Sequence, residues 1–406
     1  MTEYEQGPFE IKRQENRVPV LSWLPEQEIE PGALRQIENA ARHPNVDAHI
    51  AIMPDVHPGF GVTIGSVFPT SRTVVPNAVG VDIGCGMTAI QTGLRYDAST
   101  MGREFWRTWA GRVQREVPVG FGVHKHRSID NLGSLATPLR ATELNPVMRD
   151  KAPVQLGTLG GGNHFLEAQV DQHGIIWLMV HSGSRHTGLR IANHYHKLAV
   201  EIDRKHGRPT DDGLSALPLD EQVGQDYIQD HQWARTFAQM SRRHMIERMK
   251  DALEAMKHGT EILRFIDCAH NYATLEEHGG VQVMVHRKGA TSAQLGEEGI
   301  IPGTMGSKSY IVQGKGNEDS LNSCSHGAGR RMGRKVAKET ITQKQFNAAM
   351  VLSGSYTKVS MSHIDESPLV YKDVTEVIAR QKDLIDILFT LSPLITIKGD
   401  SKAKDD

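Results

Sequence analysis

Short runs of β-branched and apolar residues, each ended by glycine or proline, dominate three parts of this 406-residue chain. They lie at residues 61–95, 154–184 and 261–316. Such runs are typical of short strands joined by tight turns, because glycine adopts backbone angles that other residues avoid and proline cannot donate to a sheet. Polar residues follow several of these runs, so we expect the functional groups to lie at strand ends.

Helices are expected around these strand regions. Residues 31–43 begin with proline and continue with helix-forming residues, which predicts a first helix, and residues 48–57 (AHIAIMPDVH) then predict a short buried strand. Residues 231–257 carry apolar side chains at three- to five-residue spacing, which predicts an amphipathic helix. We interpret its methionine-rich stripe as core packing rather than as a binding surface.

Towards the end of the sequence, residues 373–390 predict a second amphipathic helix, followed by a last apolar strand at residues 394–399. Residues 119–152 and 203–226 have weak periodicity and are expected to be loops or lids. No repeat or low-complexity linker divides the chain. We therefore expect one compact catalytic domain over residues 1–399, followed by a polar tail at residues 400–406.

Composition narrows the class of protein. The 39 glycines and 20 histidines favour an enzyme, and a net charge of −2 argues against non-specific coating of nucleic acid, although a local basic patch remains compatible with it. Three cysteines cannot form a disulfide framework, and neither a secretory signal nor a membrane-spanning segment is evident in the sequence. The expected location is the reducing cytoplasm, with no membrane partner.

Four short polar segments carry the residues suited to metal binding. They are Asp82 to Cys85, Gly162 to His164, His181 to Ser184, and Cys268 to Asn271. A single buried histidine is more often a core residue than a ligand, but metal sites in enzymes are assembled from distant strand ends such as these. Cysteine with histidine suits Zn²⁺, whereas aspartate with histidine suits Mn²⁺ or Fe²⁺ as well, so the residues leave the metal open.

Glycine-rich segments at residues 156–163, 302–309 and 326–329 expose backbone amides that can surround phosphate oxygens, although none has the Walker A spacing. The third contains His326, whose small neighbours leave room for a large reactant. An accessible imidazole beside a metal-held phosphate predicts nucleophilic attack on phosphorus. The basic run that follows would contact phosphate or, alternatively, form a solvated helix face; it comprises Arg330, Arg331, Arg334, Lys335 and Lys338.

These segments together resemble the RtcB family of RNA-splicing ligases. The similar blocks extend over nearly the whole chain in the family's order, among them MPDVHPGFGVTIGSV (53–67), VGVDIGCGM (79–87), LGTLGGGNHFLE (156–167), VHSGSR (180–185), CAHNY (268–272), IIPGTMGSKSYIV (300–312), CSHGAGR (324–330), YKD (371–373) and IKG (397–399). The resemblance implies a single α+β domain with mixed β-sheets, surrounding helices and a deep cleft for metal and nucleotide.

The resemblance also implies two Mn²⁺ ions and GTP. Cys85 would bridge the two ions, His164 and His181 would complete one site, and Asp82 and His270 would complete the other. His326 would attack the α-phosphorus of GTP, giving a histidine-linked guanylate and pyrophosphate. The residues implied to bind the nucleotide are Asn163, His164, Glu167, His270, Asn271, Pro302, Gly303, Thr304, Met305, Ser309, His326, Gly327, Ala328, Gly329 and Lys398.

The implied reaction joins two RNA ends. A 3′-phosphate would take the guanylate to form an RNA-ppG end, and a 5′-hydroxyl would then displace GMP; a 2′,3′-cyclic phosphate would first be opened by metal-activated water. Such enzymes act in RNA repair or tRNA splicing, and a helper protein for turnover is left open. Glu167 is our inferred acceptor for guanine N1 and N2, with a surface glutamate as the alternative.

Two other classes of function remain at the level of the sequence. The same ligands could support a metal-dependent phosphohydrolase or phosphodiesterase that forms no covalent guanylate, and loss of His326 would distinguish it from a ligase. A nucleic-acid-binding or chaperone-like paralogue with a vestigial site is the other alternative. It is disfavoured because every expected ligand is present.

Overall fold

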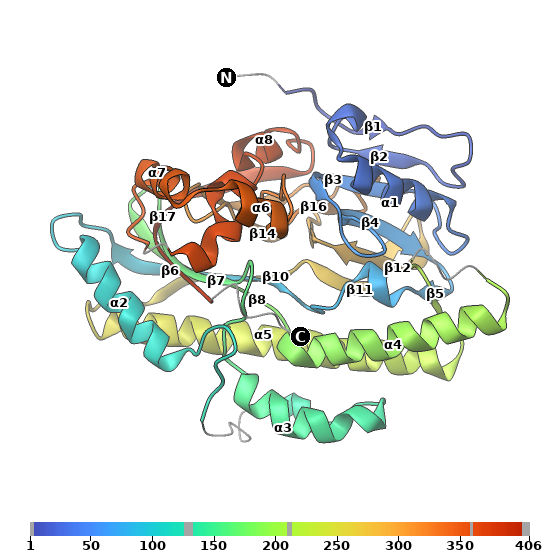
Figure 1. The fold of residues 1–406 in the computed structure, drawn as a ribbon, viewed down its shortest axis with the longest axis horizontal. Coiled ribbons are helices and arrows are strands. Elements are labelled where there is room, and N and C mark those ends of the chain that lie inside the picture. Colours follow the sequence, from blue (N-terminus) through green and yellow to red (C-terminus); the bar gives the residue numbers. More distant parts are fainter. Residues whose placement is uncertain (1–3, 126–132, 209–212, 358–359, 400–406) are drawn as a thin grey trace.

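Two β-sheets occupy the centre of the molecule in the computed structural model, which describes residues 4–125, 133–208, 213–357 and 360–399 (Figure 1). The first has six strands in the order β1-β2-β3-β4-β12-β11. In that order the strands are β1 (Phe9–Glu10), β2 (Val20–Ser22), β3 (Ile50–His57), β4 (Ile64–Thr70), β12 (Val281–Lys288) and β11 (Asn271–His278). Its β2–β3 pair is parallel and its other pairs are antiparallel, so this sheet is mixed.

The second sheet has seven antiparallel strands in the order β10-β6-β8-β7-β17-β15-β14. In that order they are β10 (Ile262–Ala269), β6 (Gly86–Arg95), β8 (Ile175–Ser182), β7 (Phe165–Asp171), β17 (Ile385–Lys398), β15 (Ser309–Gly314) and β14 (Glu298–Ile301). Two small ladders pair β13 (Ala290–Ser292) with β16 (Ser323–Ser325) and β5 (Thr73–Val74) with β9 (Leu217–Pro218). A single residue, His270, separates β10 from β11 and so lies where the chain passes between the two large sheets.

Helices surround these sheets. They are α1 (Pro31–Arg42), α2 (Arg103–Glu116), α3 (Asn145–Gln155), α4 (Arg185–Lys205), α5 (Gln222–Glu254), α6 (Arg334–Thr340), α7 (Gln343–Ser353) and α8 (Val374–Ala379). The long helices α4 and α5 run together along the lower side of the molecule in Figure 1, and α6 and α7 lie on the upper side. None of the described helices combines the length and the apolarity that a membrane span needs.

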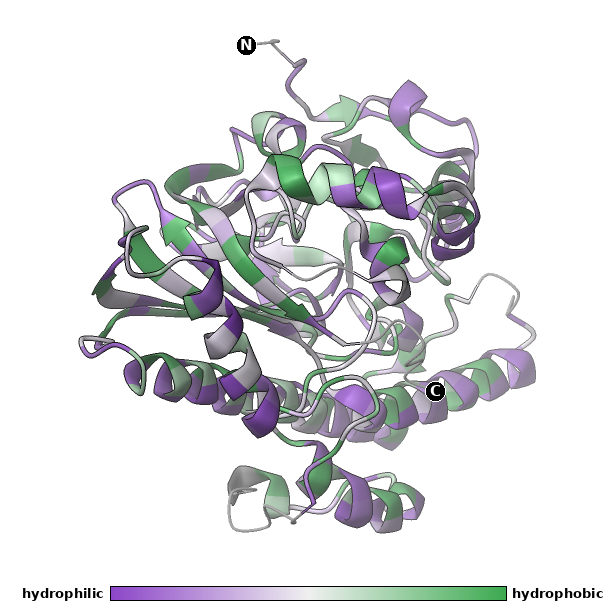
Figure 2. Cartoon of the chain, turned by 60° about the vertical axis from the view of Figure 1, so that its left-hand side comes forward, coloured by the Kyte–Doolittle hydropathy of each residue, from purple (hydrophilic) through white to green (hydrophobic). Residues whose placement is uncertain are grey.

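The largest core cluster joins α5 and α2 to the seven-stranded sheet. Met245, Met249 and Leu253 of α5 pack there with Trp106 and Trp109 of α2, and all five side chains are fully buried. Hydrophilic and hydrophobic residues alternate along the long helices that cross the lower half of Figure 2, as expected for helices with one buried face. Core packing is therefore the role of the methionine stripe. The α+β class is confirmed, and of the two large sheets the six-stranded one is mixed whereas the seven-stranded one is antiparallel.

Several expected boundaries were wrong. The long helix begins at Gln222 rather than at residue 231. The segments expected to be loops contain α3 and the adjoining ends of α4 and α5. The helix predicted at 373–390 is only α8, which ends at Ala379, because the residues from Ile385 onwards pair with β15. The predicted tail at 400–406 lies outside the described residues.

Candidate active site

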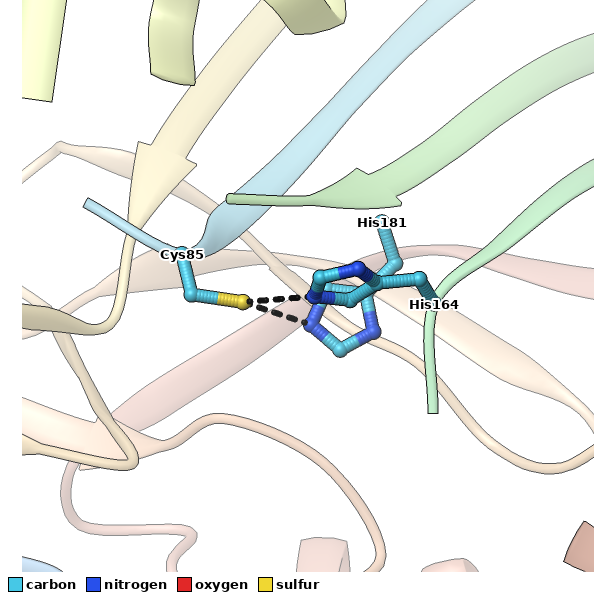
Figure 3. A group of neighbouring side chains, drawn as sticks. All are labelled: Cys85, His164 and His181. Atoms are coloured by element: carbon cyan, nitrogen blue, oxygen red, sulfur yellow. Dashed lines mark hydrogen bonds between the residues drawn. The ribbon is translucent and has the colours of Figure 1, made fainter. Parts of the chain in front are cut away.

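Three buried side chains meet at the ends of strands β6, β7 and β8 (Figure 3). Cys85 immediately precedes β6, His164 immediately precedes β7, and His181 lies near the end of β8. The Cys85 Sγ lies 3.4 Å from His164 Nε2 and 3.3 Å from His181 Nε2. The antiparallel register brings them together, because His181 pairs with Met87 of β6 and with Phe165 of β7.

Two more of the predicted metal ligands adjoin these three. Asp82 Oδ2 lies 3.0 Å from His164 Nε2, and His270 Nε2 lies 3.3 Å from His181 Nε2. The backbone N–H of Ser184 donates to Asp82 Oδ1 at 2.9 Å and so fixes this carboxylate. The structure thus brings together all five residues expected to bind metal. We call them the ligand cluster: Asp82, Cys85, His164, His181 and His270.

The protonation states in the ligand cluster suit a cation. Burial opposes the charge of Asp82, but the hydrogen bond and the charge of His164 lower its carboxyl pKa to about 2. Burial lowers the pKa of His181 and His270 well below the usual range, so both imidazoles are neutral and have a free lone pair. Burial and the charge of Asp82 raise the pKa of Cys85 well above its usual range, so this thiol needs a bound cation to ionise.

The ligand cluster fits divalent transition-metal ions. Ligand atoms about 2.1–2.3 Å from a tetrahedral ion lie roughly 3.4–3.8 Å apart, close to the separations from Cys85 to the two histidines. Among the described residues, Nδ1 of His164 and Nδ1 of His270 have no hydrogen-bond partner, so these buried rings are incompletely satisfied by protein alone. The mixture of sulfur, nitrogen and oxygen donors is compatible with Zn²⁺, Mn²⁺ or Fe²⁺.

His326 lies directly beside the ligand cluster, with its ring centroid 4.8 Å from that of His270. Its Nδ1 lies 2.7 Å from Oδ2 of Asp55, a fully buried residue of β3, and its backbone N–H donates to the same oxygen at 3.2 Å. The Asp55 carboxylate therefore faces the Nδ1 side of the ring, although Nδ1 makes no aligned hydrogen bond to it, and Nε2 lies on the opposite side of the ring. Nε2 would be the ring nitrogen available for nucleophilic attack.

The glycine-rich segment after His326 packs directly on β3. Gly329 has a φ of +71°, and a Cβ at this position would lie 2.2 Å from the carbonyl oxygen of Asp55. Only glycine allows this approach, so the backbone around His326 and the strand that carries Asp55 are held in contact.

A cavity of about 400 Å³ opens beside His326, within the range of nucleotide-sized pockets. Most residues predicted to bind the nucleotide line it; these are Asn163, Glu167, Pro302, Gly303, Thr304, Met305, His326, Gly327, Ala328, Gly329 and Lys398. His181 of the ligand cluster also lines this cavity, which therefore connects the ligand cluster, His326 and the glycine-rich segments.

Four residues predicted to bind the nucleotide do not line the cavity. His164 and His270 belong to the ligand cluster. Asn271 donates to the carbonyl of Asp82 at 3.3 Å and accepts from the backbone of Gly289 at 2.9 Å. Ser309 accepts at 3.1 Å from the backbone of Gly303. Asn271 and Ser309 therefore support the residues around the site rather than face the cavity.

Glu167 lies on the cavity wall with its side chain buried, so the alternative of a surface glutamate is wrong. Thr396 donates to Oε2 at 2.5 Å and Gln169 donates to Oε1. Burial raises the carboxyl pKa to about 7, while these hydrogen bonds and the charge of Lys398 oppose a further rise. A buried carboxylate on the wall of a pocket is suited to accept from paired donors of a ligand.

The basic run divides into two groups. Arg330 Nη1 and Arg334 Nη1 lie 3.2 Å and 3.1 Å from Oε1 of the buried Glu366, and Lys398 Nζ lies 3.4 Å from its Oε2. These four residues line the cavity, and one carboxylate faces three cations. Asp365 is a second buried carboxylate beside this group, with its Oδ2 3.4 Å from Arg334 Nη1, so carboxylates balance part of the positive charge on this wall. The solvated-face alternative is thus wrong for Arg330, whose side chain is 15% exposed. Arg334 lines the cavity but keeps 45% of its side chain exposed, and Lys335, 90% exposed, fits the alternative.

Three residues of this site received no role in the sequence analysis. Asp55 was noticed only as the end of a strand, Tyr371 only as part of a similar block, and Glu366 not at all. Asp55 contacts the proposed nucleophile, and the hydroxyl of Tyr371 donates to Glu366 at 2.5 Å. Asp55 and His326 are 271 positions apart, and nothing in either local sequence indicates the contact.

Comparisons with known proteins identify the relatives of this chain. A sequence model of the family described as tRNA-splicing ligase RtcB matches residues 36–399. The chain is 36% identical to the RNA-splicing ligase RtcB of Escherichia coli K12, over 96% of this chain and the full length of that relative. It is 30% identical to RNA-splicing ligase RtcB homolog 1 of Entamoeba dispar (91% of this chain, 82% of the relative) and 29% identical to tRNA-splicing ligase RtcB of Thermococcus kodakarensis (94% and 95%).

Proposed function

This chain belongs to the RtcB family, and on that basis we propose that it is a GTP- and Mn²⁺-dependent RNA ligase. It joins RNA ends that carry a 3′-phosphate or a 2′,3′-cyclic phosphate to RNA ends that carry a 5′-hydroxyl, in RNA repair or tRNA splicing. The observation that carries the proposal is the position of His326, which lies between the ligand cluster and a nucleotide-sized cavity with its Nδ1 beside Asp55.

The ligand cluster would hold two Mn²⁺ ions. Cys85 would bridge them, with His164 and His181 completing one site and Asp82 and His270 completing the other. The mutual proximity of Cys85, His164 and His181 supports the first grouping. When bound, the ions supply Lewis acidity and offset the negative charge of phosphate oxygens.

His326 performs the first covalent step in this proposal. Its Nε2 attacks the α-phosphorus of GTP, a nitrogen–phosphorus bond forms, and the bond from the α-phosphorus to the bridging oxygen breaks, so that pyrophosphate leaves with the electron pair. Asp55 holds the proton on Nδ1 and stabilises the positive charge that develops on the ring. The guanylate then lies in the cavity that His326 lines.

Glu167 and Lys398 would select and orient the nucleotide. Glu167 would accept from guanine N1 and N2, and adenine would leave this buried carboxylate unpaired. Lys398, Arg330 and Arg334 would place positive charge beside the phosphates of GTP or of RNA. The 3′-phosphate of one RNA end takes the guanylate from His326, and the 5′-hydroxyl of the other end then displaces GMP.

The proposed compartment is the cytoplasm. All three cysteines are free and buried, and a metal-binding Cys85 requires a reduced thiol, which a reducing compartment maintains. RNA and GTP are the proposed partners, and a helper protein that assists turnover is compatible with a covalent intermediate.

Incubation with α-labelled GTP and Mn²⁺, followed by a denaturing gel, tests the proposal. We expect a protein label that is labile to acid and stable to alkali, as a phosphoramidate is, and we expect His326→Ala to lose it. His258→Ala, which changes a fully solvated histidine, is the matched control and should keep the label. A wild-type protein that gains no label under these conditions contradicts the proposal.

Joining of a 3′-phosphate RNA to a 5′-hydroxyl RNA tests the second half of the reaction. Ligation should require GTP and disappear in His326→Ala. Release of inorganic phosphate from the RNA end, undiminished in His326→Ala, would instead identify a phosphohydrolase.

A further inference from the structure

Arg242 of helix α5 is a buried charge that the proposed reaction does not use. Its side chain is 1% exposed, and it extends from the helix beneath the seven-stranded sheet to the strand ends that carry the ligand cluster. It lies on the helix whose apolar stripe packs in the core, yet its guanidinium makes several hydrogen bonds. A residue that only filled space in the core would not need these bonds.

The guanidinium of Arg242 joins three ligand-bearing segments. Nη1 donates to the carbonyl of Gly84 at 2.7 Å and to the carbonyl of Ser182 at 3.1 Å. Nε and Nη2 donate to Oδ1 and Oδ2 of Asp267 at 2.9 and 3.0 Å. Gly84 lies between two predicted ligands, Ser182 follows His181, and Asp267 is three residues before His270, so one rigid group connects all three chain segments.

Each of these contacts limits how a ligand segment can move. Gly84 adopts a φ of +72°, and a Cβ there would lie 2.8 Å from the Cα of Arg235, so its loop rests directly on α5. Asp267 also accepts from Thr88 of β6, which ties the same carboxylate to the strand that follows Cys85. The fork of an arginine can bind one carboxylate and two carbonyls together, whereas the point charge of a lysine cannot.

We propose that Arg242 is a positioning residue for the metal centre. Its guanidinium holds the strand ends that carry Cys85, His181 and His270 at the spacing that bound metal requires. The inference rests on the proposed function, because the metal dependence belongs to it. Groups that orient metal ligands from outside the coordination sphere commonly change metal affinity by about 10- to 100-fold when replaced. A purely structural ion pair would change stability without a selective effect on metal binding.

The test is titration of the metal-free full-length protein with Mn²⁺, with free Mn²⁺ measured by electron paramagnetic resonance. We expect Arg242→Lys to weaken Mn²⁺ binding by about 10- to 100-fold while near-ultraviolet circular dichroism shows a folded protein. Arg380→Lys is the matched control, because Arg380 is also buried and binds the carboxylates of Glu28 and Glu376, outside the ligand cluster. It should bind Mn²⁺ as the wild type does.

A folded Arg242→Lys protein with wild-type Mn²⁺ affinity overturns the inference, and so does an equal loss of affinity in Arg380→Lys. If Arg242→Lys does not fold, Asp267→Asn takes its place; it keeps the size of the group but removes the charge that orients the guanidinium, and wild-type affinity there also overturns the inference. A wild-type protein that binds no Mn²⁺ contradicts the proposed metal dependence itself, so the two failures can be told apart.

Discussion

Asp55 shows how one residue determines the chemistry of another. It is fully buried, and its carboxylate contacts both Nδ1 and the backbone N–H of His326. Two effects follow from this contact. In the proposed reaction, this carboxylate would favour the tautomer with the proton on Nδ1, and it would offer a fixed counter-charge to the positive charge that develops on the ring during attack.

We expect Asp55→Asn to lower the rate of histidine guanylylation by roughly 100- to 10,000-fold, because the amide can neither hold the required tautomer reliably nor neutralise the imidazolium. Single-turnover labelling with α-labelled GTP measures this rate. Asp230→Asn provides the control, since Asp230 is another buried aspartate that accepts from backbone N–H groups, at Arg140 and Ala141. Equal rates in wild type and Asp55→Asn would refute the role of Asp55.

At the scale of elements, helix α6 carries both a cavity-lining and a solvated cation. It begins at Arg334, a short distance after the glycine-rich segment that carries His326. Arg334 lines the cavity and contacts Glu366, whereas Lys335, the next residue, is 90% exposed and lies 4.0 Å from Glu339. Two neighbouring cations on one helix therefore have different surroundings.

This difference gives a matched pair of variants. Arg334→Ala should weaken the binding of RNA with a 3′-phosphate and reduce the slope of log affinity against log salt by about 1, because one phosphate contact is lost. Lys335→Ala should leave both quantities near their wild-type values. Fluorescence anisotropy at several salt concentrations measures them. The same effect in both variants would show that the cations act only through net charge.

Element boundaries show where local sequence is insufficient. Residues 373–390 have helical periodicity, but Val312 and Ile311 of β15 pair with Ile387 and Phe389, and the end of the segment, from Ile385 onwards, belongs to β17. Periodicity cannot report the presence of a neighbouring strand. Helix α1 and strand β3, by contrast, were predicted closely, because a proline start and a continuous apolar run are local signals.

For the molecule as a whole, the ligand cluster lies where segments from distant parts of the sequence converge. Strands β6, β8 and β10 bring their ends together, and His270 also connects the two large sheets. Metal bound there would cross-link segments that separate on unfolding, so it should stabilise the native state only while the cluster is intact.

We expect Mn²⁺ to raise the unfolding temperature of the wild type, since a ligand at about 100 times its dissociation constant adds about 2.7 kcal/mol to stability. Cys85→Ala should lose this increase. Cys268→Ala should retain it, because Cys268 is buried like Cys85 but lies outside the ligand cluster. Differential scanning calorimetry with Mn²⁺ and with a chelator measures the effect, and an unchanged increase in Cys85→Ala would exclude Cys85 as a ligand.

Local sequence was sufficient to predict the class of fold, the family and the segments that carry the proposed metal and nucleotide residues. Those residues occur in short motifs, in which the polar side chain lies close to a glycine in the sequence. The order of residues within each motif is therefore enough to predict where these side chains occur. Only the tertiary structure decided that Asp55 contacts His326, that Glu366 faces three cations and that Arg242 joins three ligand segments. The reason is physical: each of these contacts connects residues far apart in the chain, and packing alone sets their distance and burial.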